Sequence, residues 1–484
     1  LNAAAWRALH AQPDADRDAT RRAHHAVAAA DADAIWEFAG AAGRQAAWAR
    51  AHHAAVTWFE RALDHAAGRP DAERAALYDA YAQELDTVDR RRDAVAAREN
   101  AIEIWDALGD RAALGESLAR LSVLFQLVGR MPEAVAANAR ALAALEPLGP
   151  SPALISAYNT QAWMHLGSGT SEAGVAVAER AIEMAEELGA LDDLPRLTEI
   201  AGLCELYRDS ERAMALLDRS LSLSLEQGLM TRAGNTYANL GSIYIDFHQF
   251  DRADALQSHG LAFSSSHELS SVHAFIEGWQ AVLEVHLGRW ALADATIGRA
   301  LERPAPSPGR GPALLALGRL NARRGTGDAM AALRESLDIL QSQGFRQREG
   351  LIRSALAEAA WHAGDIPGVL AQVDEGLPLA LRFRQPWYVG ELGYWGWRVG
   401  RPVDLPEWTA EPYVLQIAGR AAEAAERWAA MGCPYERARA LAEGDPKDRA
   451  TALALFEGLG AGPALQALRG TRAGRPSPHA GPRW

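Results

Sequence analysis

The chain has 484 residues, of which 49% are hydrophobic and 23% are charged, and its formal net charge is −13. The acidic balance argues against a surface that wraps nucleic acid, because such a surface needs clustered lysine and arginine side chains. Ala, Leu, Arg and Glu dominate, and since these residues are strong helix formers, the composition predicts an all-α fold. No run of 18 apolar residues indicates a membrane-spanning helix.

The N-terminal segment, residues 1–35, is predicted to form helices that either cap the fold or end an upstream module. It begins LNAAAWRALH, with Leu instead of Met, and shows neither a basic leader nor an apolar signal region. The two cysteines, Cys204 and Cys433, form no CxxC pair and are expected to be buried free thiols in a reducing compartment. We therefore expect a cytoplasmic segment of a longer protein.

Residues 36–384 carry a repeated pattern. A small or apolar anchor residue is followed four positions later by an apolar or bulky residue, and the anchors recur at intervals of 39, 40, 40, 39, 40, 40, 36 and 40 residues. This regularity predicts a right-handed α-solenoid of about nine or ten helical hairpins, with about 40 residues per repeat. The anchors are Ala55, Ala94, Ala134, Gly174, Ala213, Ala253, Ala293, Ala329 and Val369.

Each hairpin is expected to pack through small side chains. The first helix presents a small residue where the second helix must approach, and the turn between them often carries Gly, which tolerates positive φ. The small residues are Gly43, Ala82, Ser122, Ala162, Gly241 and Ala281. The proline-rich stretch ERPAPSPGRGP at 302–312 coincides with the shortened interval and is read as a stiff connector or a gentle bend.

Residues 385–468 are predicted to form an irregular aromatic-rich segment followed by C-terminal helical hairpins, with Ala424 as the next candidate anchor. The segment contains Trp387, Trp395, Trp397 and Trp408. Large rings can seal the end of a solenoid, which we favour, or build an aromatic ligand pocket. The Pro/Gly/Arg-rich residues 469–484 are predicted to be a disordered tail.

The stretch around Ala253 resembles the tetratricopeptide family. Tyr237, Leu240, Gly241, Tyr244 and Ala253 match the pattern of that family, whereas Gln257 and Gly260 depart from it. The repeats here are also longer than the usual unit of about 34 residues.

A second resemblance covers essentially the whole chain. RRAHHAVAAADADAIWEF near the start, and PWYVGELGYW and GCPYERARALAEGD near the end, resemble the helical array of large bacterial ATP-binding LuxR-type (MalT-like) transcriptional regulators. Those proteins join a P-loop ATPase, a helical sensor and a DNA-reading domain. This sequence contains no G-x-x-x-x-G-K-[ST] motif and no LuxR-type helix-turn-helix, so the resemblance assigns neither ATP hydrolysis nor DNA binding to any residue.

The candidate binding groove lies on the first helices of the hairpins. Asn159, Trp163, Asn235 and Ser242 fall at positions that point into the groove of tetratricopeptide arrays, as the anchor alignment places them. Amides beside an aromatic ring would suit an extended peptide or a small-molecule effector.

Three motifs invite other interpretations. GSGTSEAG at 167–174 lacks the lysine of a phosphate loop and is assigned to a turn, and SSSHELSSVH at 264–273 is assigned to a link between repeats. The pairs His24/His25 and His52/His53 are adjacent on a helix, about 100° apart, and are expected to pack or be solvated instead of sharing a metal ion. We predict no enzymatic site, cofactor or metal.

The sequence therefore predicts a non-catalytic binding protein. The main interpretation is the sensor segment of a LuxR-type regulator, with a protein, a peptide or a small effector as partner and no direct contact with nucleic acid or membrane. The alternative is a free-standing tetratricopeptide scaffold or adaptor that recognises a peptide or a protein.

Overall fold

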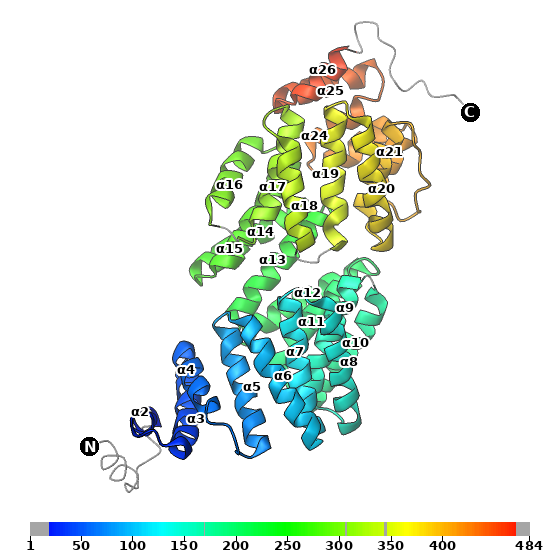
Figure 1. Cartoon of the computed structure of the whole chain (residues 1–484). Helices are drawn as coiled ribbons and strands as arrows, with labels where there is room; N and C mark the ends of the chain where they lie inside the picture. The colour runs from blue at the N-terminus through cyan, green and yellow to red at the C-terminus, as the bar shows by residue number, and fades with distance from the viewer. Residues whose placement is uncertain (1–18, 169, 305–306, 343–345, 471–484) are drawn as a thin grey trace. The chain divides into compact units, whose positions relative to one another are not determined.

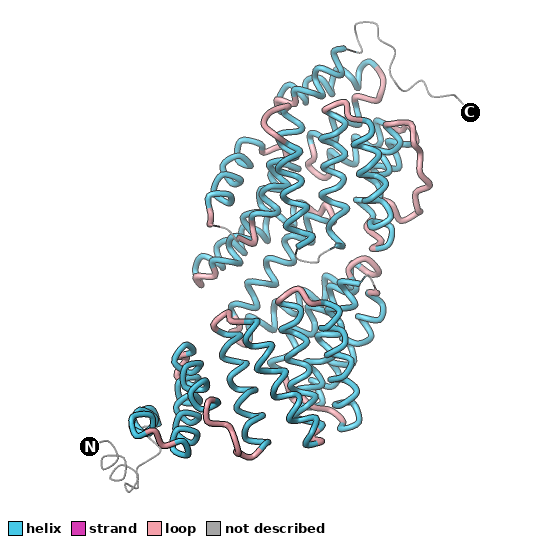
Figure 2. Tube along the Cα trace, in the orientation of Figure 1, coloured by secondary structure: helices cyan, strands magenta, loops and turns pink. Residues whose placement is uncertain are grey.

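The computed structural model describes residues 19–168, 170–304, 307–342 and 346–470, and over these residues it contains helices and no strand (Figures 1 and 2). The chain divides into two compact units, which are described separately. The first unit comprises residues 1–164 and 176–191, and the second comprises 165–175 and 192–484. The predicted boundaries at 35 and 384 do not coincide with this division, which falls inside the repeat array.

The repeats are helical hairpins, as the anchor spacing predicts, and the first helix of each is called the A helix. The two helices of a hairpin pack against each other, as α5 with α6 and α7 with α8. The A helices are α3 (Ala32–Trp48), α5 (Asp71–Thr87), α7 (Arg111–Leu127), α9 (Pro152–Ser168), α11 (Leu194–Glu205), α13 (Met230–Asp246), α15 (Ser270–His286), α17 (Arg310–Arg324), α19 (Glu349–His362) and α21 (Pro386–Arg398).

The second helix of each hairpin, the B helix, carries the predicted anchor. Eight of the nine anchors are buried, and Ala329 is half-buried. The B helices are α4 (His52–Leu63), α6 (Arg91–Leu108), α8 (Met131–Leu145), α10 (Ser171–Leu188), α12 (Ser210–Glu226), α14 (Phe250–Ser266), α16 (Trp290–Glu302), α18 (Ala329–Ser342) and α20 (Ile366–Arg382).

Small residues bring the two helices of a hairpin together. The hydroxyl of Ser122 on α7 donates a hydrogen bond of 2.8 Å to the carbonyl oxygen of the anchor Ala134 on α8. A side chain on Gly43 would overlap the ring of Phe59, which lies four residues after the anchor Ala55. The predicted packing role of these small residues is confirmed, because a larger side chain would separate the helices.

In seven of the turns, the residue five positions before the anchor is left-handed. At Gly129, for example, φ is 77°, and the N–H of Arg130 then donates to the carbonyl oxygen of Phe125 at 2.8 Å. This bond satisfies a carbonyl that the helix end would leave unpaired. The same left-handed position is occupied by Arg50, Asp89, Gly129, His248, Gly288, Gly364 and Gly419.

The shorter interval of 36 residues before Ala329 leaves the packing of its hairpin unchanged. Gly318 on α17 lies against the carbonyl of Ala329 and the side chain of Leu333, as Gly202 on α11 lies against Ala213 and Leu217. In both of these hairpins, the hydroxyl of a serine seven residues after the anchor donates a hydrogen bond to the A helix. Ser220 donates to the carbonyl oxygen of Pro195, and Ser336 donates to that of Gly311. The packing register thus continues through the proline-rich stretch, of which residues 305–306 lie outside the described residues.

The C-terminal helices belong to the second unit and share its hydrophobic core. Trp395, Trp428 and Phe456 lie in the same buried cluster as Leu240 and Val369 of the array. The candidate anchor Ala424 is buried in α23. These helices are α22 (Glu411–Ile417), α23 (Ala421–Ala430), α24 (Pro434–Leu441), α25 (Pro446–Leu459) and α26 (Gly462–Gly470). Most of the predicted tail, residues 471–484, lies outside the described residues.

The remaining elements are short or terminal. Helix α2 (Ala19–Ala29) packs into one core with α3 and α4 in the first unit. Among the described residues, the 3₁₀ turns η2 (Glu146–Leu148), η3 (Leu191–Asp193) and η4 (Arg346–Arg348) lie between hairpins. Both cysteines are buried free thiols, as predicted.

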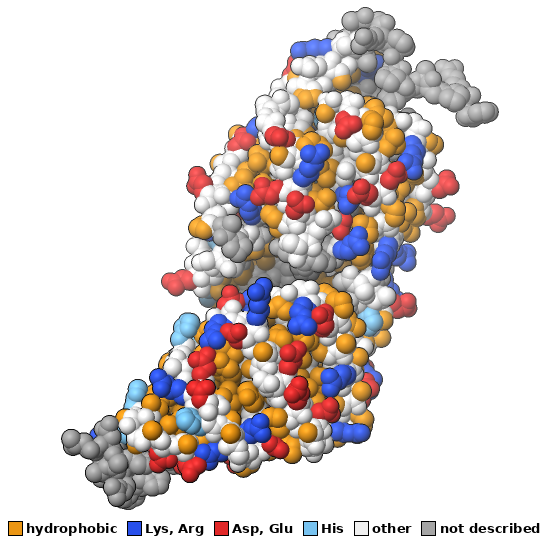
Figure 3. All heavy atoms as spheres, viewed as in Figure 1, with side chains coloured by type: hydrophobic (Ala, Val, Ile, Leu, Met, Phe, Trp, Pro, Cys, Tyr) orange, Lys and Arg blue, Asp and Glu red, His pale blue; other side chains and the backbone are white. Residues whose placement is uncertain are grey.

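The surface mixes charges of both signs. On the face that Figure 3 shows, Lys and Arg side chains are interspersed with Asp and Glu side chains and apolar groups. Many are local pairs, such as Arg130 with Glu133 at 2.9 Å. No helix among the described residues is long and apolar enough to cross a membrane.

Candidate binding face of the helical hairpins

The repeat register defines an inner face on the A helices. We use this name for the A-helix residues that precede an anchor by eleven and by seven positions, together with their immediate neighbours on the same helix. In the second unit the polar residues at these positions are Ser242 and Asp246 on α13, His286 on α15, and Glu358 and His362 on α19. All except the half-buried His362 are buried.

Helix α24 covers this face in the second unit. The guanidinium of Arg323 on α17 donates to the Glu436 carboxylate at 2.7 Å, and its Cζ lies 4.0 Å from the centre of the Tyr435 ring. Nε2 of His362 lies 2.9 Å from the Tyr435 hydroxyl, and Nδ1 of His286 lies 3.7 Å from Glu436. Three A helices therefore contact two adjacent residues of one C-terminal helix.

The contacts continue beneath α24 as a buried ionic network. Arg323 also donates to both carboxylate oxygens of Glu358, at 3.0 and 3.3 Å. Beside it, Arg319 donates to Glu391 and to the Ser354 hydroxyl, both at 3.0 Å. Such pairs hold in a low-dielectric interior only because each charge faces an opposite one.

The arginines fix the ionisation of the buried carboxylates. Burial by itself would raise the pKa of Glu436, but the Arg323 charge holds that pKa well below its usual range. Burial likewise opposes ionisation of Glu358, and the charges of Arg323 and Arg319 lower its pKa. The histidines behave differently, because burial lowers the pKa of His286 and takes the pKa of His362 to about 4. Both imidazoles are therefore neutral at pH 7.

Arg439 attaches the far end of α24 through aromatic rings. Its Cζ lies 4.6 Å from the ring centre of Tyr394 and 5.5 Å from those of Trp395 and Tyr413. None of its guanidinium nitrogens has a hydrogen-bond partner among the described residues. Contact with ring faces stabilises a cation by about 0.5–2 kcal/mol, which suits a buried arginine without a direct carboxylate partner.

A second polar group lies at the α13 end of the face. The Tyr388 hydroxyl donates to Asp246 at 2.5 Å, and Arg348 contacts Asp246 at 3.1 Å and the Ser242 hydroxyl at 2.8 Å. His248, which follows α13, stacks on Trp387 with ring centres 3.8 Å apart and planes 7° apart. Residues of the inner face on α13, α15, α17 and α19 are thus contacted by residues from later in the chain.

The four predicted aromatic residues do not form one site. Trp395 is buried against Trp361 and Tyr394, whereas Trp387 is half-buried and stacks on His248. The ring centres of Trp397 and Tyr394 are 5.8 Å apart, and Cζ of Arg384 lies 5.8 Å from the ring centre of Trp408. The rings pack against the protein's own side chains, in the manner expected of sealing residues, and the pocket interpretation remains a prediction.

The four predicted groove residues fall in different units. Asn159 and Trp163 belong to the first unit, whereas Asn235 and Ser242 belong to the second. Asn235 is exposed, but Ser242 is buried and bonded to Arg348. Asn159 is buried, with no partner for Oδ1 among the described residues, and Trp163 is half-buried.

The inner face of the first unit has a different character. On α7 the two register positions are Val123 and Leu127, whose exposed fractions are 37% and 52%. Trp163 on α9 precedes its anchor by the same eleven positions as Val123. On α5 the corresponding residues are the exposed polar Gln83 and Thr87. At Val123 and Leu127 the first unit therefore presents apolar side chains to solvent, whereas the second unit buries both Val282 and His286 at the corresponding positions of α15.

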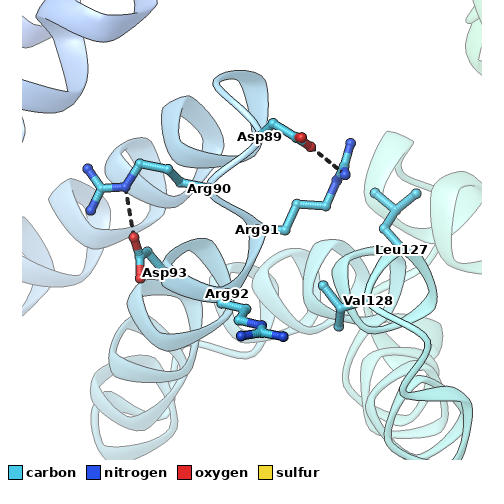
Figure 4. Close-up of a pocket in the computed structure, with 7 residues that line it drawn as sticks. All are labelled: Asp89, Arg90, Arg91, Arg92, Asp93, Leu127 and Val128. Carbon is cyan, nitrogen blue, oxygen red and sulfur yellow. Dashed lines mark hydrogen bonds and ion pairs between the residues drawn. The ribbon is translucent and has the colours of Figure 1, made fainter. Parts of the chain in front are cut away.

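A pocket adjoins this exposed row. It has a volume of about 490 Å³ and lies between the α5–α6 turn, Asp89–Asp93, and the end of α7, where Leu127 and Val128 line it (Figure 4). Arg90 pairs with Asp93 at 2.7 Å, and Arg91 pairs with Asp89. Arg92 makes no hydrogen bond or ion pair within the described part of the chain.

The remaining sequence motifs lie in turns or contact neighbouring helices. GSGTSEAG lies where α9 ends and α10 begins, and SSSHELSSVH joins α14 to α15, as predicted. His24 packs edge-on against Trp58, and Nδ1 of His52 lies 2.7 Å from Glu84. Within the described ranges, no group of three or more His, Cys, Asp or Glu side chains is arranged to hold a metal ion.

Sequence reasoning missed the network under α24. Its helical spacing was visible, because Arg319 and Arg323 lie one turn apart on α17, as do Glu358 and His362 on α19. Charged pairs at such positions on an otherwise apolar helix signal a buried partner. The partner helix lies in GCPYERARALAEGD, where the sequence indicates only a family resemblance.

The comparisons with known proteins found solved structures of low similarity and no related sequence. No protein-family model matches it, and no curated protein sequence matches it. A structure of BtubC (BKLC) from P. vanneervenii matches with a TM-score of 0.38 and 18% identity, over 46% of this chain and 92% of that one. A Rap protein complexed with competence and sporulation factor matches with a TM-score of 0.41 and 12% identity, over 83% and 99%. At these TM-scores neither likeness identifies a family or a function for the chain.

Proposed function

We propose that the chain is a non-catalytic repeat scaffold that captures a peptide or protein partner on the inner face of its first unit. One observation carries the proposal: the second unit already holds a helix of the chain itself on its inner face, whereas the same repeat positions in the first unit are open. The open positions are apolar at Val123 and Leu127. A groove between hairpins that accepts a helix is a common mode of peptide recognition.

The physical driving force would be burial of the exposed side chains. Covering apolar surface stabilises a complex by roughly 25 cal/mol per Å², and a partner helix would cover its own apolar stripe as well. Contiguous apolar surface on a folded protein often marks an interaction site. The aromatic ring of Trp163 would add contact area at the next A helix, since tryptophan frequently dominates binding energy.

The proposal is tested with a displayed library of random 16-residue peptides selected against the intact chain. We expect the selected peptides to lose binding to a Val123→Glu/Leu127→Glu variant, because two carboxylates would be buried by the partner. The matched control is Val135→Glu on the B helix α8, whose side chain is 51% exposed outside the inner face.

The control variant should bind the selected peptides as the unmodified chain does. Both variants must first show unchanged helical content and unfolding midpoints. Peptides that bind the double variant as well as the unmodified chain, or a selection that enriches none, would overturn the proposal.

The narrower function that we propose, the sensor segment of a bacterial LuxR-type regulator in the cytoplasm, rests on the sequence resemblance. A protein or peptide partner, or a small effector, would then alter the array and control the associated ATPase and DNA-binding domains. Deletion of residues 36–384 from the intact regulator should abolish the effector response of its target promoter. A response that survives the deletion would leave the free-standing scaffold as the function.

A further inference from the structure

We propose that the partner of the first unit is an amphipathic helix that carries an Asp or Glu side chain for Arg92. This inference rests on the proposed function and specifies the chemistry of the partner. It is carried by the charges of the pocket beside Leu127, by the continuity of that pocket with the inner face, and by the way the second unit binds its own helix.

The pocket contains one cation without a counter-charge. Arg90 contacts Glu60 at 2.9 Å and Asp93 at 2.7 Å, and Arg91 contacts Asp86 at 3.5 Å as well as Asp89. The two carboxylates that line the pocket, Asp89 and Asp93, are therefore already paired with Arg91 and Arg90. Arg92 has no ion pair or hydrogen bond among the described residues, and Figure 4 marks no interaction between its side chain and the other residues drawn. A ligand carboxylate is the complementary group, because arginine binds carboxylates through two parallel hydrogen bonds.

The pocket and the apolar row form one surface. Leu127 lines the pocket and is also the register residue one helical turn after Val123 on α7. A helix that covers Val123 and Leu127 therefore reaches the pocket mouth within about one further turn of 5.4 Å. Its apolar residues would recur three and four positions apart, and the acidic residue would follow them at the pocket end.

The second unit provides the pattern for such a complex. There Tyr435 and Glu436 of α24 lie together on the face, and the Glu436 carboxylate accepts a hydrogen bond of 2.7 Å from Arg323. One arginine–glutamate pair beside a large side chain thus attaches the resident helix. In the first unit, Arg92 and Leu127 line one pocket and offer a cation next to an apolar side chain. Among the described residues, no carboxylate pairs with this arginine.

The test is a charge swap in the same displayed library of 16-residue peptides. The unmodified chain should enrich peptides with apolar residues at i and i+4 and an Asp or Glu near one end. Arg92→Glu should weaken the binding of these peptides by about tenfold at low salt and should enrich Lys or Arg at the same place. The control Arg111→Glu, at an exposed arginine at the start of α7, should change neither.

The outcomes separate this inference from the proposed function. Peptides that need Val123 and Leu127, yet show no acidic preference and no response to Arg92→Glu, would overturn the acidic partner and leave the binding face intact. Peptides that ignore Val123 and Leu127, or none at all, would overturn both. Weaker binding by Arg92→Glu without enrichment of basic peptides would also contradict the charge pairing.

Discussion

The two units share one repeat geometry, but they differ in how far their inner faces are covered. Val282 in the second unit and Val123 in the first are the same residue type, each eleven positions before its anchor. The exposed fraction of Val282 is 2%, whereas that of Val123 is 37%. Packing within a hairpin is alike in both, so the difference comes from what covers the A helices. A repeat array sets where a binding face lies, and the rest of the chain decides whether that face is free.

The largest contrast should appear between buried and exposed ion pairs. Arg323→Met would leave Glu358 and Glu436 buried without their partner and should lower the free energy of unfolding by about 3–5 kcal/mol. Arg120→Met on α7 removes an exposed pair with Glu116 at 2.9 Å and should cost only about 0–1 kcal/mol. Urea unfolding of the two variants measures both. Equal losses would mean that the network under α24 does not stabilise the second unit.

Acid should act selectively on the second unit. The pKa of His362 is about 4 in the folded chain and about 6.5 when unfolded, so the unfolded state binds more protons between these values. Stability from this group is present above pH 6.5 and is lost as the pH falls towards 4, by about 2–3 kcal/mol. Burial lowers the pKa of His286 and of His248 as well, which adds to the loss.

The measurement for this prediction is the urea midpoint of the chain between pH 7 and pH 4. His362→Gln, which can still bond the Tyr435 hydroxyl, should flatten the dependence between pH 6.5 and 4. An unaltered slope in that variant would show that other groups bind the protons.

Val282 and Val123, which occupy equivalent inner-face positions, allow a matched test of burial. Val282→Ala should cost about 2 kcal/mol, from lost transfer free energy and a residual cavity. Val123→Ala should change the free energy of unfolding by less than about 0.5 kcal/mol, because its side chain is already in contact with water. A loss of 2 kcal/mol at Val123 would instead indicate that something covers the face of the first unit in solution.

The smallest contrast concerns the left-handed turn residues. Arg50→Gly should stabilise the first unit by about 0.5–1 kcal/mol, since an exposed arginine there gains nothing from φ of 58°. His248→Gly relieves the same strain at φ of 55° but removes the ring stacked on Trp387, so a net loss of about 1 kcal/mol is expected. Thermal unfolding of both variants checks the difference in sign. A gain at His248 would show that the stacking contributes little.

Much of the architecture follows from local spacing. The anchor intervals located all nine B helices, and Gly318 with Ser336 show that even the shortened repeat keeps its register. The prediction works because each small residue contacts a neighbour about twelve positions away, as Ser122 contacts Ala134. The candidate groove stays a prediction: of the family positions, Ser242 is buried and Asn235 is exposed, and the exposed Leu127 is not among them.

The sequence by itself determined the repeat, the helix pairing and the turn chemistry, because these depend on residues close together in the chain. Only the tertiary structure decided which inner face is covered, since the hydrogen bond from Arg323 to Glu436 joins residues 113 positions apart. The spacing of hydrophobic residues and the helix propensities do not predict such a pairing. It depends on complementary charges and rings that meet only after the hairpins have stacked, and the same stacking leaves Val123 and Leu127 uncovered.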